Sequence, residues 1–115
     1  MTLPELLSWQ WRGYPTYHRD RINLLIHLAA VPLFMLANVL IVVAALRLSA
    51  VALVGGIVAS VVSLALQGRG HRRERVPPEG FTSVANFVAR FFFEQWLTFP
   101  RFVASGGWWA NFVEK

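Results

Sequence analysis

The sequence predicts an all-α membrane protein, a single domain (1–115) built around a two-helix transmembrane hairpin. Hydrophobic residues make up 56% of the 115 residues and charged residues only 15%, whereas soluble domains usually have about 25% charged residues. The mean hydropathy is +0.48, and residues 22–67 contain a single charged side chain, Arg47. A soluble chain this short could not bury so much apolar surface. We therefore expect the lipid bilayer to be its main surroundings.

Arg47 divides the apolar stretch into two predicted spans, Ile22–Leu46 and Leu48–Gln67. Each has about 20 residues, which is enough to cross the hydrocarbon core as a helix. Two segments cannot close a barrel, so each must satisfy its backbone hydrogen bonds as a helix. A very short turn at Arg47 would make the spans antiparallel neighbours. Gly56 and Ser60 are four residues apart in the second span, and this spacing of small residues favours close helix contact.

Arginines flank both spans at the same predicted side of the membrane, and the net charge is +5. Three precede the first span and four follow the second: Arg12, Arg19 and Arg21, then Arg69, Arg72, Arg73 and Arg75. The positive-inside rule therefore predicts that both termini are cytoplasmic. The expected location is a bacterial inner membrane or an endomembrane.

The two terminal segments combine aromatic and charged residues, which is typical of helices that lie in the membrane interface. Thr82 or Ser83 can cap a helix that ends near residue 98. This helix would contain Arg90 and Glu94, which are four residues apart and can pair along one face. The segment before Arg12 is rich in Leu and Trp. The predicted architecture is thus a transmembrane hairpin with N- and C-terminal interfacial helices.

All three histidines lie where the predicted spans meet the cytoplasmic interface. His18 precedes the first span, His27 is little more than one turn inside it, and His71 follows the second span by four residues. A tight hairpin would bring them together. Neutral imidazoles suit Fe, Zn, Cu or Ni, although His27 taken alone could simply hydrogen-bond a neighbouring helix. Asn23, one turn before His27, can orient that ring or a ligand, and Glu74 lies three residues after His71.

Other chemistry has no support in the sequence. The chain contains no cysteine, so a disulfide framework, a thiolate metal site and a cysteine nucleophile are excluded. The Gly68–Gly70 segment is not a dinucleotide fingerprint. Basic and aromatic residues lie where lipid interfaces place them, so we expect no nucleic-acid partner.

Two sequence blocks resemble a known family. The first is Tyr17–His27, which has the pattern H-x4-N-x3-H and runs into an apolar span with Pro32. The second is Gln67–His71, followed by Glu74 and Pro77. These blocks are similar to those of the fungal-type 2-hydroxy fatty acid dioxygenases, membrane proteins that shorten 2-hydroxy-palmitic acid by one carbon in fatty-acid alpha-oxidation. The resemblance covers roughly residues 14–80.

The resemblance implies a site for Fe(II). His18, His27 and His71 correspond to the histidines expected to bind the iron. Glu74 would be a fourth ligand, a hydrogen-bond acceptor outside the ligand set or a base for the hydroxyl proton of the substrate. Asn23 would orient the His27 ring or the bound ligand. The reaction converts a 2-hydroxy acid and O2 into the shortened acid, CO2 and water. It needs no outside electrons, which agrees with a chain that has no flavin, nicotinamide or haem motif.

The same resemblance implies how a 2-hydroxy fatty acid would bind. Arg72, Arg73 or Arg75 could hold its carboxylate, and its acyl tail would lie along Phe91, Phe92 and the spans. Two spans alone enclose a pocket poorly. We therefore expect the C-terminal helix to form a lid, or a homo-oligomer to supply the remaining walls.

Two alternatives of other classes remain open at this point. One is a non-catalytic membrane scaffold whose arginines bind anionic lipid headgroups. The other is a metal-dependent membrane enzyme of different chemistry, such as a zinc hydrolase. Only the two enzyme hypotheses require the histidines to meet within ligand distance of one ion, about 2.0–2.2 Å.

Overall fold

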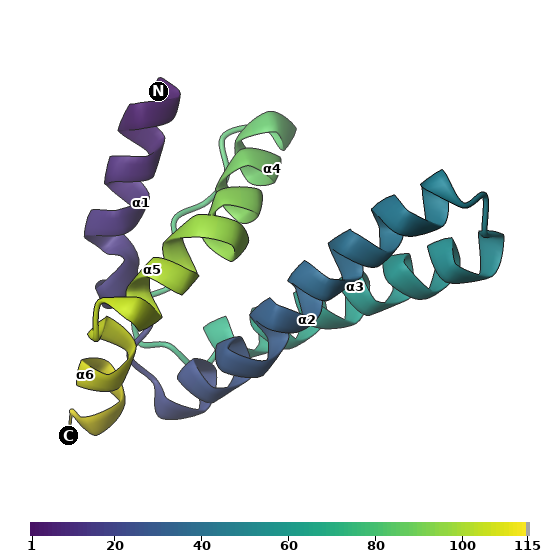
Figure 1. The fold of residues 1–115 in the computed structure, drawn as a ribbon. Helices are drawn as coiled ribbons and strands as arrows, with labels where there is room; N and C mark the ends of the chain where they lie inside the picture. Colours follow the sequence, from purple (N-terminus) through teal and green to yellow (C-terminus); the bar gives the residue numbers. More distant parts are fainter. Residues whose placement is uncertain (115) are drawn as a thin grey trace.

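A computed structural model describes residues 1–114, and every regular element in that range is helical (Figure 1). The elements in chain order are α1 (Leu3–Tyr17), α2 (Arg21–Leu46), α3 (Ala50–His71), α4 (Val84–Phe93), the π-helical turn η1 (Glu94–Thr98), α5 (Phe99–Ala104) and α6 (Gly107–Val113). In Figure 1 the α2–α3 hairpin runs from its base towards the right, while α1 and α4 rise from near the same base in a different direction.

The predicted hairpin is confirmed, with different helix ends. Asp20 caps α2 by accepting a hydrogen bond from the Asn23 backbone N–H at 3.0 Å. Leu48 adopts a left-handed conformation with φ 52° and Ser49 caps α3, so α3 begins two residues later than predicted. At its other end α3 continues past the predicted end at Gln67 to His71. The end of an apolar run shows only where the apolar surface stops, and a helix can continue beyond it.

The hairpin is held by close backbone approach and by one buried hydrogen bond. A Cβ on Gly56 would lie 2.6 Å from Cγ1 of Ile41, so the predicted close contact at this glycine is confirmed. The hydroxyl of Ser63 donates to the carbonyl of Ala30 across the helix pair at 2.6 Å. The Ser60 hydroxyl instead donates to the carbonyl of Gly56 within α3.

Both hairpin helices are long and apolar enough to cross a membrane, and most of their apolar residues face outward. Among the exposed side chains are Leu36, Val42, Val51 and Val58. Such a surface is unusual for a soluble monomer, where large contiguous apolar patches mark interaction sites.

The predicted C-terminal helix is longer than expected and changes its hydrogen bonding midway. Ser83 caps α4 as proposed, but the helix passes through η1 and continues as α5 to Ala104, beyond the predicted end near residue 98. Buried polar residues lie in η1: the amide of Gln95 exchanges two hydrogen bonds with Gln67 of α3, at 2.7 and 2.8 Å. Tertiary partners of this kind determine a π turn, so sequence periodicity does not reveal it.

The core lies where α1, α2 and α5 meet. Tyr14, Leu24, Val31, Phe99 and Phe102 pack together there and are almost completely buried. Phe102 also makes contact with the start of α6, where Gly107 leaves no room for a Cβ. This packing fixes the end of α1 against the beginning of α2, next to the histidines.

We expect Gly70→Ala to destabilise the protein by about 1–3 kcal/mol, the usual cost of overpacking. A Cβ at Gly70 would collide with the side-chain oxygen of Asn23 on α2, whereas a Cβ at Gly68 meets nothing within 4 Å. Gly68→Ala is therefore the matched control, and its stability should stay equal or rise slightly. Denaturant unfolding in detergent measures both. Equal stability of the two variants would contradict the close approach at Gly70.

Candidate metal centre

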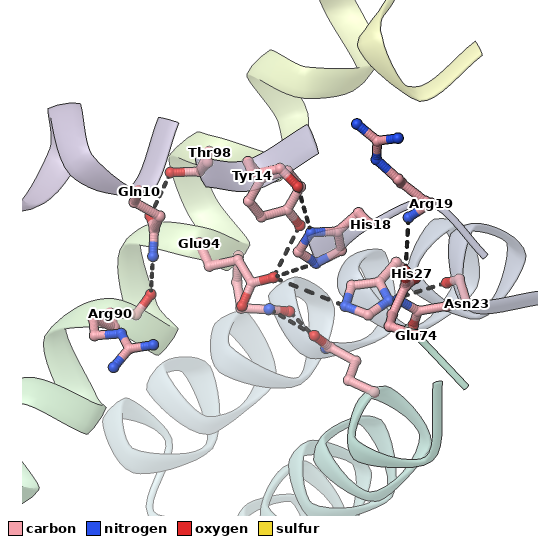
Figure 2. A network of polar contacts seen from close by, with 12 residues as sticks. Gln10, Tyr14, His18, Arg19, Asn23, His27, Glu74, Arg90, Glu94 and Thr98 are labelled. Carbon is pink, nitrogen blue, oxygen red and sulfur yellow. Dashed lines mark hydrogen bonds and ion pairs between the residues drawn. The ribbon is translucent and has the colours of Figure 1, made fainter. Parts of the chain in front are cut away.

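Three histidines and one glutamate converge at the base of the hairpin. One ligand atom each from His18, His27, His71 and Glu94 lies within 4.8 Å of the others. They come from four places in the chain: the residue that ends α1, the second turn of α2, the last residue of α3 and the first residue of η1. The predicted convergence of the three histidines is thus present, and Glu94 joins them. Figure 2 shows His18 and His27 facing the Glu94 carboxylate.

Backbone carbonyls fix the rings of His18 and His27. Nδ1 of His18 lies 2.9 Å from the carbonyl oxygen of Tyr14, and Nδ1 of His27 lies 3.0 Å from that of Asn23. Because a carbonyl only accepts, each Nδ1 must carry the hydrogen. The neutral ring then presents an unprotonated Nε2, which is the tautomer that binds a metal.

The inward-facing nitrogens have no hydrogen-bond partner within residues 1–114. They are Nε2 of His18, Nε2 of His27 and Nδ1 of His71, and all three atoms are buried. Nε2 of His18 approaches Oε2 of Glu94 at 3.3 Å and Nε2 of His27 approaches it at 3.8 Å. An unsatisfied buried polar group costs about 1–3 kcal/mol, so three at one point require an explanation.

A single metal ion would satisfy these groups together. Ligands that each lie about 2.0–2.2 Å from one ion are separated by roughly 3–4.3 Å, and the observed spread of up to 4.8 Å requires only a small contraction. Three imidazoles and one carboxylate are a ligand set suited to Fe(II) and to Zn. The donor set therefore fits a divalent transition metal.

Glu94 was not among the predicted ligands. Burial raises the pKa of its carboxyl, but a proton on the facing histidine rings, that of His18 above all, outweighs burial and lowers the pKa to about 2 when no metal occupies the site. It is thus an anion. The predicted pairing of Glu94 with Arg90 is wrong, because the two have separate partners. Arg90 donates to the carbonyls of Glu79 and Gly80 at 2.9 and 3.0 Å.

Glu74 is not one of the four candidate ligands, and its carboxylate instead holds the start of α2 by hydrogen bonds. Glu74 lies in the turn after α3, and its carboxylate accepts the backbone N–H groups of Arg19 at 2.9 Å and of Asp20 at 3.1 Å. It also accepts the side-chain amide of Asn23 at 2.6 Å. Of the three roles considered for Glu74, this geometry matches an acceptor outside the ligand set. Asn23 in turn supports His27 through its backbone carbonyl and not through its side chain.

The predicted substrate-binding residues are divided among different surfaces. Arg72 and Phe91 line a cavity of about 680 Å³ that reaches the candidate metal centre. Arg73 forms an ion pair with the cap of α2 at 3.0 Å, and with Arg75 it lines a separate cavity of about 390 Å³. Phe92 is 49% exposed and is not part of the larger cavity wall described for residues 1–114. Phe91 and Phe92 thus face different surroundings, since neighbouring helical residues point in different directions.

The large cavity lies between α1, the end of α3, the 77–81 loop and α4, and it opens onto three of the four candidate ligands: His18, His71 and Glu94. Most of the exposed wall area is apolar and comes largely from aromatic and aliphatic residues, although charged residues such as Arg12, Arg72 and Glu79 also line the cavity. The aromatic and aliphatic residues are Trp9, Tyr14, Tyr17, Leu64, Pro77, Pro78, Phe81, Phe87 and Phe91.

Tyr14 holds the Glu94 carboxylate in place. Its ring stacks on His18 with centroids 3.7 Å apart, and its hydroxyl donates to Oε2 of Glu94 at 2.9 Å. Burial and the nearby carboxylate raise the pKa of Tyr14, so the hydroxyl keeps its proton. We expect Tyr14→Phe to weaken metal binding by about tenfold or more, as loss of a hydrogen bond to a ligand usually does. Chelator competition measures this.

Tyr17→Phe is the control for that measurement. Tyr17 lines the same cavity and also lies on α1, but within residues 1–114 its hydroxyl forms no hydrogen bond with Glu94, unlike that of Tyr14. An equal loss in both variants would assign the effect to the cavity wall and not to the hydrogen bond.

Together, the fold and the site define an all-helical protein with a long apolar hairpin and a candidate metal centre of three histidines and one glutamate. Comparison of the chain with protein-family models, with curated proteins and with solved structures found no match.

Proposed function

We propose that the protein is a membrane-embedded dioxygenase that uses Fe(II) to remove one carbon from 2-hydroxy fatty acids. The observation that carries this proposal is the meeting of one carboxylate and three histidine nitrogens that lack a hydrogen bond, at the end of a mostly apolar cavity. A cavity of about 680 Å³ is within the size range of small-molecule sites. An amphiphile with an acidic head and an alkyl tail suits such a site.

Membrane insertion of the hairpin is part of the proposal. The outward-facing apolar residues of α2 and α3 support it, because an apolar helix surface is stable in contact with lipid and unfavourable in contact with water. The arginines near the ends of the hairpin opposite its turn support cytoplasmic termini, in a bacterial inner membrane or an endomembrane. The metal centre would then lie at the cytoplasmic edge of the bilayer, where fatty acids partition.

The proposed reaction balances without a further reductant. The C1–C2 bond breaks, C1 leaves as CO2, and C2 changes from a secondary alcohol to a carboxylic acid. These two carbons lose four electrons, which O2 takes up, and the products are the shortened acid, CO2 and water. Bound Fe(II) would supply the redox chemistry that lets O2 react with a closed-shell substrate.

The residues of the chain would hold and orient the reactants. The carbonyls of Tyr14 and Asn23 fix the ring tautomers, and the hydroxyl of Tyr14 fixes Glu94. Arg72 lines the cavity, and its guanidinium would bind the substrate carboxylate. The aromatic walls would exclude water from the reacting centre.

A zinc enzyme is the second candidate, and the set of candidate ligands favours it. Three histidines and a single carboxylate are also ordinary zinc ligands. A hydrolase of this kind would need no O2 and no hydroxyl group on its substrate.

The test uses the full chain purified and reconstituted in lipid nanodiscs. Elemental analysis should find about one iron per chain. Addition of 2-hydroxy fatty acids, including 2-hydroxy palmitate, should consume O2 and release CO2 and the acid shortened by one carbon in equal amounts. Absence of any stoichiometric transition metal would overturn the proposal. Stoichiometric zinc without O2 consumption would replace it with the zinc enzyme.

A further inference from the structure

One wall of the large cavity follows α1. The α1 residues that line it run from Trp9 to Tyr17, and His18 follows at the metal end. Trp9 lies nine positions before His18. At about 1.5 Å per helical residue, these positions are separated by roughly 13 Å. The cavity therefore extends well away from the metal centre, between α1 and α4.

The two ends of the cavity differ in polarity. At one end are two histidines, His18 and His71, and the carboxylate of Glu94. Towards the other end lie the rings of Trp9 and Phe81, which contact the paired guanidinium of Arg90, and the ring of Phe87, which packs against Phe81, and Glu79 also lines the cavity. A molecule that suits both ends has a polar head and an unbranched apolar tail.

The end distant from the metal has a wall that does not attract a carboxylate. The guanidinium of Arg90 lies between two rings, 4.9 Å from the centroid of Trp9 and 4.2 Å from that of Phe81. Its terminal nitrogens already donate to the carbonyls of Glu79 and Gly80. Arg90 therefore joins α1, α4 and the loop into one wall, and its charge is already satisfied.

We propose that this cavity binds the alkyl chain of the substrate along α1, with the methyl end at Trp9 and Phe81, and not along the outer surface of the hairpin. This inference rests on the proposed function. At a C–C bond length of about 1.5 Å, an extended chain advances about 1.25 Å per carbon. Roughly ten carbons beyond the head group therefore fill the cavity, so chains of about 12 to 14 carbons fit best.

Photolabelling in nanodiscs tests where the chain lies. The probe is 2-hydroxydodecanoic acid with a diazirine at its methyl end, added to the purified protein with and without metal. Label that unlabelled 2-hydroxydodecanoic acid displaces is expected on residues 9–13 and 81–87. Displaceable label on the outward residues of α2 and α3, or label that no competitor displaces, would overturn the inference.

A matched pair of variants sharpens this test. Leu64→Trp places a large ring inside the cavity, whereas Leu66→Trp adds the same ring at an exposed position of the same helix. The first should reduce displaceable labelling at least tenfold and the second should leave it unchanged. Equal labelling in both variants would also overturn the inference.

The outcomes separate this inference from the proposed function. Displaceable labelling of the cavity in a protein that consumes no O2 would support the chain site and reject the dioxygenase. O2 consumption with displaceable label on the hairpin surface would support the dioxygenase and reject the chain site. Trp9→Ala should shift the best competitor towards chains longer by two or more carbons, and an unchanged preference would reject Trp9 as the end wall.

Discussion

Substitution of His27 by alanine is expected to abolish stoichiometric metal binding and, with it, O2 consumption. The side chain of His27 is completely buried, its Nδ1 is held by the Asn23 carbonyl, and its Nε2 points into the centre without a hydrogen-bond partner in the described chain. Loss of a group that merely supports a metal ligand costs about 10–100-fold in affinity. Loss of a ligand itself should cost at least 100-fold.

The measurement is metal content after purification, together with affinity from chelator competition. Leu28→Ala on the same helix is the control, because Leu28 is 41% exposed and lies outside the centre. Since alanine at a buried position can also destabilise the fold, His71→Ala provides a second, less buried test. Folded His27→Ala and His71→Ala proteins that retain one metal per chain would show that the histidines do not share an ion.

Substitution of Glu94 by glutamine is expected to cause the second largest effect, a loss of metal affinity of about 100-fold with little change in stability. Glutamine has nearly the same shape, so the packing of η1 should persist. However, it removes the only anion among the four candidate ligands, and a carboxylate binds a dication far better than an amide does. The apparent Fe(II) affinity of the variant in nanodiscs measures the loss.

Glu79→Gln is the matched control for this substitution. Glu79 lines the same cavity, and the substitution removes one negative charge while the Glu79 carbonyl remains available to Arg90. We expect its affinity for metal to stay within a few-fold of the unmodified protein. If both variants lose the same affinity, the effect is one of general charge and Glu94 is not a ligand.

The hairpin and the meeting of the histidines were predictable because they depend on length and spacing. Two apolar runs separated only by Arg47 have to lie antiparallel, and this brings His18, His27 and His71 to one end whatever the details of packing. The place of Glu74 was not predictable in the same way. Its role depends on where α3 ends, and a helix that ends at His71 leaves Glu74 in a turn facing the start of α2.

Glu94 was missed for a different reason. On a regular helix, Arg90 is the natural partner four residues away, and helical periodicity offers no reason to look further. The π turn that begins at Glu94 depends on contacts with distant elements, including the Gln67–Gln95 amide pair. The sequence did contain a chemical indication that Glu94 has a polar or charged partner. Glu94 is an acid that directly follows three phenylalanines, and an ionisable group in such surroundings needs a partner.

The origin of the four ligands in four separate elements has a consequence for the chain as a polymer. A bound ion would act as a cross-link, closing loops between His18 and His27, between His27 and His71, and between His71 and Glu94. Such closures restrict the unfolded ensemble, and binding energy becomes folding energy. In a chain without cysteine, the ion would restrict the unfolded chain in the way that several disulfides restrict it in other proteins. Chelation should then loosen α1 and α4 along their whole length.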